Sequence, residues 1–433
     1  IWKQLGTQCR NLPQVHTIVR MMRIIGEIVC PSVALLGEVV MEPEKVVPYF
    51  GTVEKPECHM LYNVTTMATT WNSVATKDTR LLKKQLDIVN SLPREYTFLN
   101  YLRCHDDIGW GLDFGTLRSW GMKEVEHKRF LNDYFTGKFE GSPSRGELYN
   151  DDPVTQDARF CGTTASMCGV ESAGFEQNAQ KMEEAIRMDL MLHAYMLSQS
   201  GIPMLYSGDE IGQVNDYTYK KDPDKCVDSR YIHRGAFRWD LTENCQNPDT
   251  VQGKIFRALS KLEQIRKNEA IFDASANVYT YDVHDTAILG IMREKDGEKF
   301  YSFYNFSDQE RTAWMYEEGE YANLITGEKV ELKDIRIPAH DFIWAMTAKD
   351  KDEMEEDVAE EAIAEAVVAE DVIEEEPIAE ESVIGDAAEE SSETVTAPLE
   401  EKKEPVKPVS VPNKNKKIRN VSKRRAAKKH NKV

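Results

Sequence analysis

Two acidic residues are placed at the ends of two apolar runs, and their types and positions suggest glycoside chemistry. Glu38 lies near the end of the apolar run 33–40, and Asp106 follows the run 96–104. A continuous apolar run is typical of a strand in a parallel sheet, and in a (β/α)8 barrel the catalytic groups lie at the carboxyl ends of such strands. Glycoside cleavage needs a carboxylic acid that protonates the leaving oxygen and a carboxylate that faces the developing oxocarbenium charge. Glu38 and Asp106 are therefore the candidate catalytic residues.

The apolar runs alternate with segments of helical periodicity, which predicts an α/β fold. Strands are expected at 33–40, 58–63, 96–104 and 202–207, and helices at 13–29, 78–90, 181–199 and 251–268. This alternation is the signature of βα units. Residues 108–177 form an insertion far longer than an ordinary βα loop, and long loops at this end of a barrel often carry function.

Three regions are expected along the chain. Residues 1–272 form the α/β region with its insertion. Short alternating segments in 273–347, with a turn at Thr326-Gly327-Glu328, predict a small antiparallel β domain. These segments are 278–282, 286–292, 299–306, 312–316 and 335–346. Residues 348–433 contain almost no aromatic side chains. They cannot bury enough apolar surface to offset their ordering entropy, so we expect a disordered tail.

Charge is distributed unevenly along the 433 residues, whose formal net charge is −20. Residues 350–401 contain 22 acidic side chains and one Lys, and residues 402–433 contain 13 basic side chains and one Glu. The acidic remainder of the chain argues against specific nucleic-acid binding. We favour a solubilising role for the tail, because the acidic block competes for the basic end. The alternative is a basic arm that contacts an anionic surface such as RNA or a membrane.

Cysteine usage and hydropathy bear on the location of the protein. The eight cysteines are scattered without a CxxC pair, which favours free thiols in a reducing compartment over disulfides. The sequence has no apolar run of roughly 18 residues, so no transmembrane segment is expected. We therefore expect a cytoplasmic location, although a signal peptide upstream of Ile1 would be compatible with the sequence.

Four ordered motifs carry a resemblance to a known family. They are Ile1–Thr7 with Asn11–Gln14, Gly37-Glu38, Arg103–Trp110 and Gly201–Gly212. With them, residues 1–346 resemble the later part of glycoside hydrolase family 13, the α-amylase family, and within it the amylosucrases. In that family the first motif follows the fourth barrel strand, and the others mark strands five, seven and eight. The resemblance implies the C-terminal half of a (β/α)8 TIM barrel, followed by the β domain and the tail.

The resemblance also implies roles for individual residues. Glu38 would be the general acid/base, Asp106 the carboxylate that stabilises the transition state, and His105 a hydrogen-bond donor to the glucosyl hydroxyls. An acid that works near neutral pH needs a raised pKa, and the apolar neighbours of Glu38 are expected to raise it by desolvation. Strict strand alternation would place His105 and Asp106 on opposite faces, unless the chain leaves its ladder there.

The amylosucrase assignment rests on three further residues. In those enzymes the equivalents of Asp107 and Arg159 contact the sugar beside the bound glucosyl unit. The equivalent of Arg230 closes the bottom of the glucose pocket through a salt bridge with an Asp that precedes Ile1 in this numbering. Such a pocket accepts a terminal glucosyl unit and excludes a long chain. The alternative for both arginines is an ordinary surface charge.

The family nucleophile, an Asp on the fourth strand, would also precede Ile1, so the chain is expected to be an N-terminally truncated fragment without activity of its own. The implied parent is a retaining enzyme that transfers or hydrolyses glucosyl units from sucrose or α-glucans. One alternative is a hydrolase, an α-amylase or oligo-α-glucosidase. Another, of a different class, is a non-catalytic carbohydrate-binding or scaffold protein. The sugar substrate is the expected partner, and no cofactor and no metal site are expected.

Overall fold

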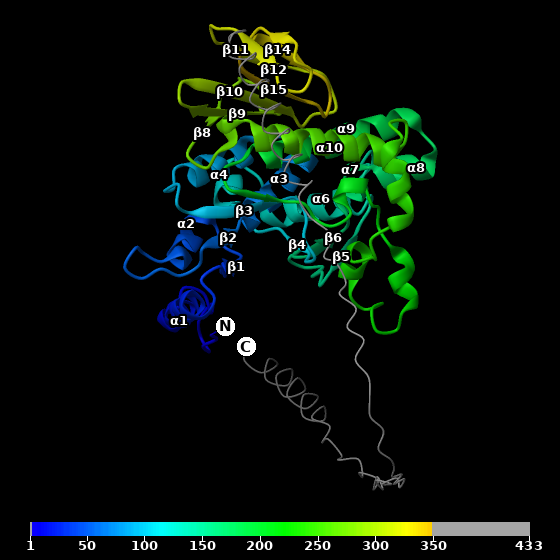
Figure 1. The fold of residues 1–433 in the computed structure, drawn as a ribbon. Coiled ribbons are helices and arrows are strands. Elements are labelled where there is room, and N and C mark those ends of the chain that lie inside the picture. The colour runs from blue at the N-terminus through cyan, green and yellow to red at the C-terminus, as the bar shows by residue number, and fades with distance from the viewer. Residues whose placement is uncertain (1, 349–433) are drawn as a thin grey trace, which may run out of the picture. The chain divides into compact units, whose positions relative to one another are not determined.

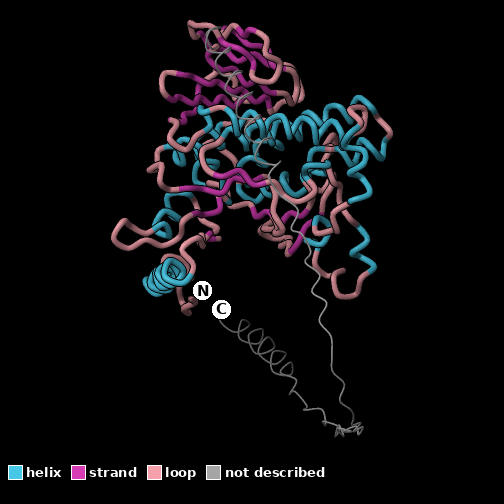
Figure 2. Tube along the Cα trace, viewed as in Figure 1, coloured by secondary structure: helices cyan, strands magenta, loops and turns pink. Residues whose placement is uncertain are grey.

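The computed structural model describes residues 2–348, all of which fall in one compact unit (Figures 1 and 2). The tail that we expect to be disordered lies outside the described residues, apart from Ala348. Figure 1 shows an antiparallel β domain stacked on two long helices, α9 and α10, with the parallel strands on the other side of these helices. None of the helices within residues 2–348 is long and apolar enough to cross a membrane.

Four strands form a parallel sheet in the order β1-β2-β3-β7. Their bounds are β1 Leu36–Gly37, β2 Met60–Tyr62, β3 Thr97–Tyr101 and β7 Ile202–Met204. Each lies within a predicted strand but is shorter than the prediction. Leu61 pairs with Gly37 on one side and with Phe98 on the other, so the strands run in close register. The α/β class is therefore confirmed, while the half-barrel interpretation stays a prediction.

The four predicted helices are present, two of them with the predicted bounds. They are α1 (Pro13–Val29), α4 (Arg80–Asn90), α9 (Ala179–Ser198) and α10 (Val251–Asn268). Helix α1 begins with Pro13 at its first position, where the missing N–H costs no hydrogen bond. A short helix α2 (Pro43–Val46) follows β1. Short 3-10 segments are η1 (Val47–Phe50), η2 (Asp209–Ile211), η3 (Tyr217–Lys221), η4 (Ser229–His233), η5 (Trp239–Gln246) and η6 (Ala270–Phe272).

Helix α3 (Val64–Thr76) was not predicted by periodicity. Its central residues are buried on all sides, so it has no amphipathic pattern, and its threonines favour strand by propensity. Burial is tolerated because the hydroxyl groups donate to the carbonyl four residues earlier: Thr69 to Thr65, Thr70 to Thr66 and Ser73 to Thr69. Trp71, also in this helix, is fully buried and donates to the carbonyl of Leu102.

The insertion at 108–177 is an ordered substructure rather than a loop. A three-stranded antiparallel sheet has the order β4-β6-β5, with bounds β4 Ile108–Gly109, β5 Glu147–Tyr149 and β6 Arg159–Cys161. Its helices are α5 (Phe114–Ser119), α6 (Glu124–Phe135), α7 (Thr164–Cys168) and α8 (Val170–Glu176). Phe160 of β6 pairs with Ile108 and Leu148 and is fully buried, so this small sheet is tied to the main core.

The C-terminal segments form a six-stranded antiparallel sheet in the order β13-β12-β15-β10-β9-β8 and a separate pair β11–β14. The strands are β8 (Asn277–Tyr281), β9 (Ile288–Lys295), β10 (Glu298–Asn305), β11 (Arg311–Tyr316), β12 (Tyr321–Asn323), β13 (Lys329–Val330), β14 (Lys333–Ile337) and β15 (Phe342–Thr347). The expected turn is confirmed, with Gly327 at φ +75° between β12 and β13. The single predicted segment 335–346 is instead two strands, because the chain turns through His340 at φ +55°.

Strand β10 is covered on both faces, which joins the β domain to the helices. Phe300 and Tyr304 share one core with Leu192 and Tyr195 of α9, while Phe303 packs toward the β11–β14 pair. Trp344 donates to the hydroxyl of Tyr304, which donates in turn to the carbonyl of Ala194. The boundary expected near residue 272 stays a prediction.

Candidate active site

Three of the predicted site residues, His105, Asp106 and Asp107, lie directly beyond the carboxyl end of β3. The chain leaves the sheet there, and the fully buried Arg103 fixes its path. The guanidinium of Arg103 donates to the carbonyl of Gly162 at 2.8 Å and to the carbonyl of Asp106 at 2.9 Å. Because these residues lie outside the ladder, strand alternation does not separate His105 from Asp106.

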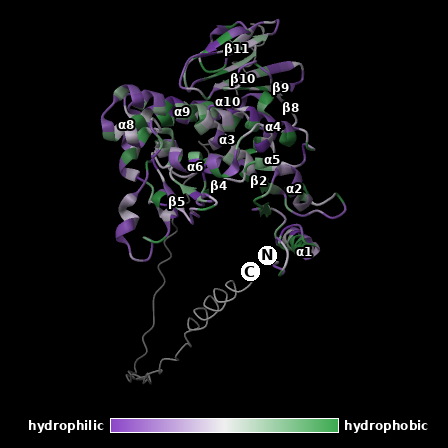
Figure 3. Cartoon of the chain, turned by 180° about the vertical axis from the view of Figure 1, so that it is seen from behind, coloured by the Kyte–Doolittle hydropathy of each residue, from purple (hydrophilic) through white to green (hydrophobic). Residues whose placement is uncertain are grey.

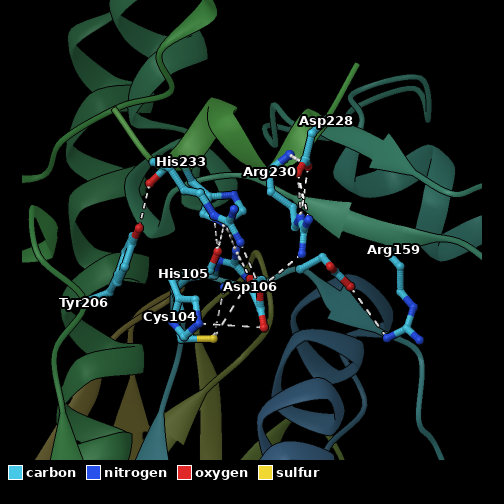
Figure 4. A network of polar contacts seen from close by, with 11 residues as sticks. Cys104, His105, Asp106, Arg159, Tyr206, Asp228, Arg230 and His233 are labelled. Carbon is cyan, nitrogen blue, oxygen red and sulfur yellow. Dashed lines mark hydrogen bonds and ion pairs between the residues drawn. The ribbon is translucent and has the colours of Figure 1, made fainter. Parts of the chain in front are cut away.

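The carboxylate of Asp106 faces two arginines from a segment more than a hundred residues away (Figure 4). Its Oδ1 atom lies 2.8 Å from Nη2 of Arg234 and 3.3 Å from Nη1 of Arg230. The other oxygen, Oδ2, lies 3.8 Å from Nε2 of His105, and the Asp106 side chain is one third exposed. One carboxylate oxygen is thus held by cations, and the other is open toward His105 and solvent.

Arg230 is fixed by its own local sequence. It is the second residue of the 3-10 segment η4, which begins at Ser229, and the side chain of the capping Asp228 accepts from the backbone N–H of Arg230. The same carboxylate binds the guanidinium, with Nη2–Oδ2 at 2.7 Å, and this hydrogen bond raises the pKa of Arg230 and lowers that of Asp228. The guanidinium also lies over the ring of Tyr149. The predicted partner of Arg230 was an Asp upstream of Ile1, and here its partners are Asp228 and Asp106.

Asp107 and Arg159, which are separated by about fifty residues of sequence, lie side by side. Nη1 of Arg159 lies 3.6 Å from Oδ2 of Asp107. Arg159 is on β6 opposite Gly109 of β4, and a Cβ atom at Gly109 would lie only 2.6 Å from Nη1 of Arg159. Glycine at this position therefore lets the arginine side chain cross the strand. The guanidinium is half exposed, so the pair stays accessible to a ligand.

Glu38 lies on the exposed edge of the sheet. We expected its apolar neighbours to bury it, and that expectation is wrong. Glu38 itself is exposed, as are Leu36 and Val40, because β1 is an edge strand with only two paired residues. Tyr62 on β2 is nevertheless within electrostatic reach of both Glu38 and Asp106. Its pKa is raised, most of all by burial and then by Cys104 and these two carboxylates.

Further residues of the site were missed by sequence reasoning. Arg234 donates to the carbonyl of His105 and binds Asp106. His233 is buried, and burial together with Arg103 lowers its pKa to about 2, so it is neutral. Nε2 of His233 lies 3.2 Å from the carbonyl of His105. The hydroxyl of Tyr206 donates to the backbone carbonyl of His233 at 3.0 Å. The local sequence signal for His233 and Arg234 is the clustering of basic residues in 230–234.

A buried ion cluster lies behind this site. His193 of α9 has Nδ1 at 3.0 Å from Asp189 and Nε2 at 3.6 Å from Asp209, and all three side chains are buried. Burial opposes the charged form, but the two carboxylates outweigh it and raise the pKa of His193 to about 10. Asp209 also accepts from the backbone N–H of Tyr206, which connects this cluster to His233.

Comparison with known proteins identifies relatives, although no family model matches the chain. Glucosylglycerate phosphorylase of Spirochaeta thermophila is 23% identical over 68% of this chain and 47% of its own length. Glucosylglycerate phosphorylase of Escherichia coli is 23% identical over 71% of this chain and 52% of its own length. Trehalose synthase of Thermus thermophilus is 29% identical over 49% of this chain and 18% of its own length. The chain is related to the α-amylase family.

The solved structures agree on the fold. Sucrose 6F-phosphate phosphorylase from Thermoanaerobacter thermosaccharolyticum superposes with a TM-score of 0.53 at 18% identity, over 78% of this chain and 58% of that one. The maltose complex of AmyP superposes with a TM-score of 0.51 at 14% identity, over 77% of this chain and 63% of that one. The chain spans about half the length of the phosphorylases that it matches.

Proposed function

We propose that this chain is part of a retaining enzyme that cleaves α-glucosidic bonds in sucrose or short α-glucans and transfers the glucosyl unit. The observation that carries the proposal is the arrangement beyond β3, where Asp106 faces Arg230 and Arg234 with His105 beside it. The relatives support it, because they are named as enzymes of glucosides and of trehalose. The sugar itself is chosen from the resemblance to the amylosucrases.

In this mechanism Asp106 stabilises the oxocarbenium-like transition state through its open oxygen, while the arginines hold the other oxygen in place. Glu38 first gives a proton to the leaving sugar and then takes one from the acceptor. The covalent nucleophile that the resemblance implies would lie on a strand before β1. The chain of 433 residues by itself is therefore expected to release no fructose from sucrose.

A second candidate function is phosphorolysis, in which phosphate accepts the glucosyl unit. The site favours it because Arg159, Arg230 and Arg234 surround residues 106–107, and guanidinium groups bind phosphate oxygens in a bidentate manner. The match to proteins named phosphorylases points the same way. Glucose 1-phosphate formed from sucrose and phosphate would distinguish phosphorolysis from hydrolysis and from transfer to a sugar.

The decisive test uses the natural protein that contains this chain. Glu38→Gln should lower turnover of sucrose by at least about a hundredfold, and turnover of an activated aryl α-glucoside much less, because a good leaving group needs little protonation. Glu44→Gln, in α2, is the matched control and should leave both rates unchanged. Equal losses on the two substrates would refute the acid role. Asp107→Ala and Arg159→Ala should change the preference between donors, and an unchanged preference would remove the amylosucrase-like assignment.

A further inference from the structure

A cavity of about 750 Å³ lies away from the candidate active site. It is bounded by α6 and the loop after it, by α8 and α9, and by two loops of the β domain at Asp308 and 339–340. None of the predicted site residues lines it. Its volume is in the range of small-molecule pockets, which often form where separate substructures meet. We propose that this cavity is a second binding site, and that it takes a neutral oligosaccharide such as a short α-glucan.

A polar cluster lies on the wall that the β domain contributes. Oδ1 of Asp308 accepts from Nε2 of His340 at 2.8 Å and binds Nζ of Lys77 at 2.9 Å. Lys77 also lies 3.5 Å from the hydroxyl of Tyr134. Both contacts of Asp308 use the same oxygen, and its side chain is 68% exposed. The other carboxylate oxygen is therefore free to accept hydrogen bonds from ligand hydroxyl groups.

Two residues of this cluster, Lys77 and His340, have unfavourable left-handed backbone conformations. Lys77 ends α3 at φ +58°, where glycine is the usual residue, and His340 has φ +55°. Such conformations are unfavourable for residues with a Cβ atom and are concentrated at functional sites. His340 is 6% exposed, and its Nδ1 atom is buried without a hydrogen-bond partner among the described residues. A buried polar atom of this kind is rare in folded proteins.

An aromatic wall faces the same space. Phe130, Tyr134 and Phe139 line the cavity, and the rings of Phe130 and Phe139 pack edge to face with centroids 5.1 Å apart. Phe139 is 46% exposed, although a phenylalanine ring gains free energy from burial. The apolar face of a pyranose ring packs well on such a surface. Aromatic rings beside hydroxyl-binding groups are the combination that suits a sugar.

The charges of the lining exclude a strongly charged ligand. Apart from His340, four basic and four acidic side chains line the cavity, so their formal charges cancel. Lys77 is paired with Asp308, and Lys181 with Glu176. Nη1 of Arg145 donates to the carbonyls of Ser142 and Ser144. A phosphate group would meet carboxylates as often as cations, whereas a neutral polyhydroxyl ligand can use both as acceptors and donors.

The test is calorimetric titration of the full chain with maltotriose. We expect saturable binding that Phe139→Ala and Asp308→Ala each weaken about tenfold. Two controls match these changes outside the cavity: Phe175→Ala removes a 92% exposed ring on α8, and Asp282→Ala removes the partner of the exposed His284. Neither control should change the affinity. His340→Gln, which keeps hydrogen-bonding groups, serves as a milder variant if Asp308→Ala unfolds.

The outcomes separate this site from the candidate active site. Asp106→Asn should leave maltotriose binding intact, and the proposal needs no bond cleavage, so it can fail or succeed independently of the proposed function. Absence of saturable binding would overturn it. Binding that is lost in Asp106→Asn but kept in Phe139→Ala would assign the sugar to the active site instead. Inorganic phosphate that binds and displaces maltotriose would show an anion site and would also overturn the proposal.

Discussion

The buried His193 should give this protein a stability that falls with pH in a narrow alkaline window. Its imidazolium lies between the carboxylates of Asp189 and Asp209, and no part of the His193 side chain is exposed. These carboxylates raise its pKa to about 10, against an ordinary value near 6.5, even though burial acts in the opposite direction. The folded chain thus keeps a proton that the unfolded chain releases.

The sign and size of the effect follow from linkage. Between about pH 6.5 and 10 the folded state holds one proton more than the unfolded state, so the free energy of unfolding decreases by about 1.4 kcal/mol for each pH unit. The contribution is complete below pH 6.5 and is lost as the pH rises through the folded pKa. His127, His233 and His340 have lowered pKa values, mainly from burial. They change stability below about pH 6.5 and not above it.

Urea unfolding of the full chain at pH 7.5, 8.0 and 8.5 measures this contribution as a difference between two proteins. Burial raises the pKa of several cysteines, among them Cys58 and Cys104, and unfolded cysteines ionise from about pH 8.5, so they add the same pH slope to wild type and variant. Over this pH unit the wild-type protein should lose about 1.4 kcal/mol more than His193→Gln, in which only the slope of the other groups remains. The matched control is His284→Gln, which changes a 74% exposed histidine and should keep the wild-type slope. A wild-type slope near zero, or the same slope in His193→Gln, would refute the assignment of a charged His193.

Two other predictions concern stability and association. Arg293→Met should lower the free energy of unfolding by about 3–5 kcal/mol in urea titrations, because the fully buried Arg293 donates to the carbonyls of Ser198, Ile271 and Asp273, which would lose their partners. Arg336→Met, on exposed β14, should cost under about 0.5 kcal/mol, and equal losses would contradict the argument. Helix α1 leaves apolar side chains exposed, among them Ile28 and Val29, so Val29→Lys should reduce concentration-dependent association measured by sedimentation (Figure 3). Val154→Lys changes a similarly exposed but isolated valine, and an equal effect there would refute a role for the α1 surface.

The elements that the sequence predicted well are those with one apolar face. Helices α1 and α10 have the predicted bounds, and all four predicted strands of the sheet are present. Helix α3 was not predicted because it is buried on every side, so its sequence has no hydrophobic periodicity. The prediction of a single strand at 335–346 was wrong because the chain turns through His340, in a left-handed conformation that a histidine rarely adopts. Periodicity thus reports how an element is exposed, and it is silent about fully buried helices and unusual turns.

The candidate site was predictable in part for a related reason. The motif residues 105–107 follow β3, as their position after an apolar run indicates, and Arg159 lies beside Asp107, while the roles that the resemblance implies for them stay predictions. The environment of Glu38 was predicted wrongly, because whether β1 is central or at an edge depends on neighbouring strands and not on its own residues. Arg234, the second cation at Asp106, was missed because its contact spans 128 residues of sequence. Long-range ion pairs of this kind leave no local pattern.

The position of Asp106 depends on the interior of the protein as well as on its own loop. Asp209 binds His193 on α9 and the backbone of Tyr206, and the hydroxyl of Tyr206 donates to the carbonyl of His233. Nε2 of His233 in turn lies 3.2 Å from the guanidinium of Arg103, which can donate to it. The same Nε2 lies 3.2 Å from the carbonyl of His105 and can bond only one of these two groups at a time. Arg103 fixes the backbone of Asp106. Each step is a hydrogen bond or an ion pair, and most of the atoms involved are buried, where such contacts are costly to break. The loop that carries the candidate stabilising carboxylate is therefore held by the same polar network that surrounds the buried ion cluster.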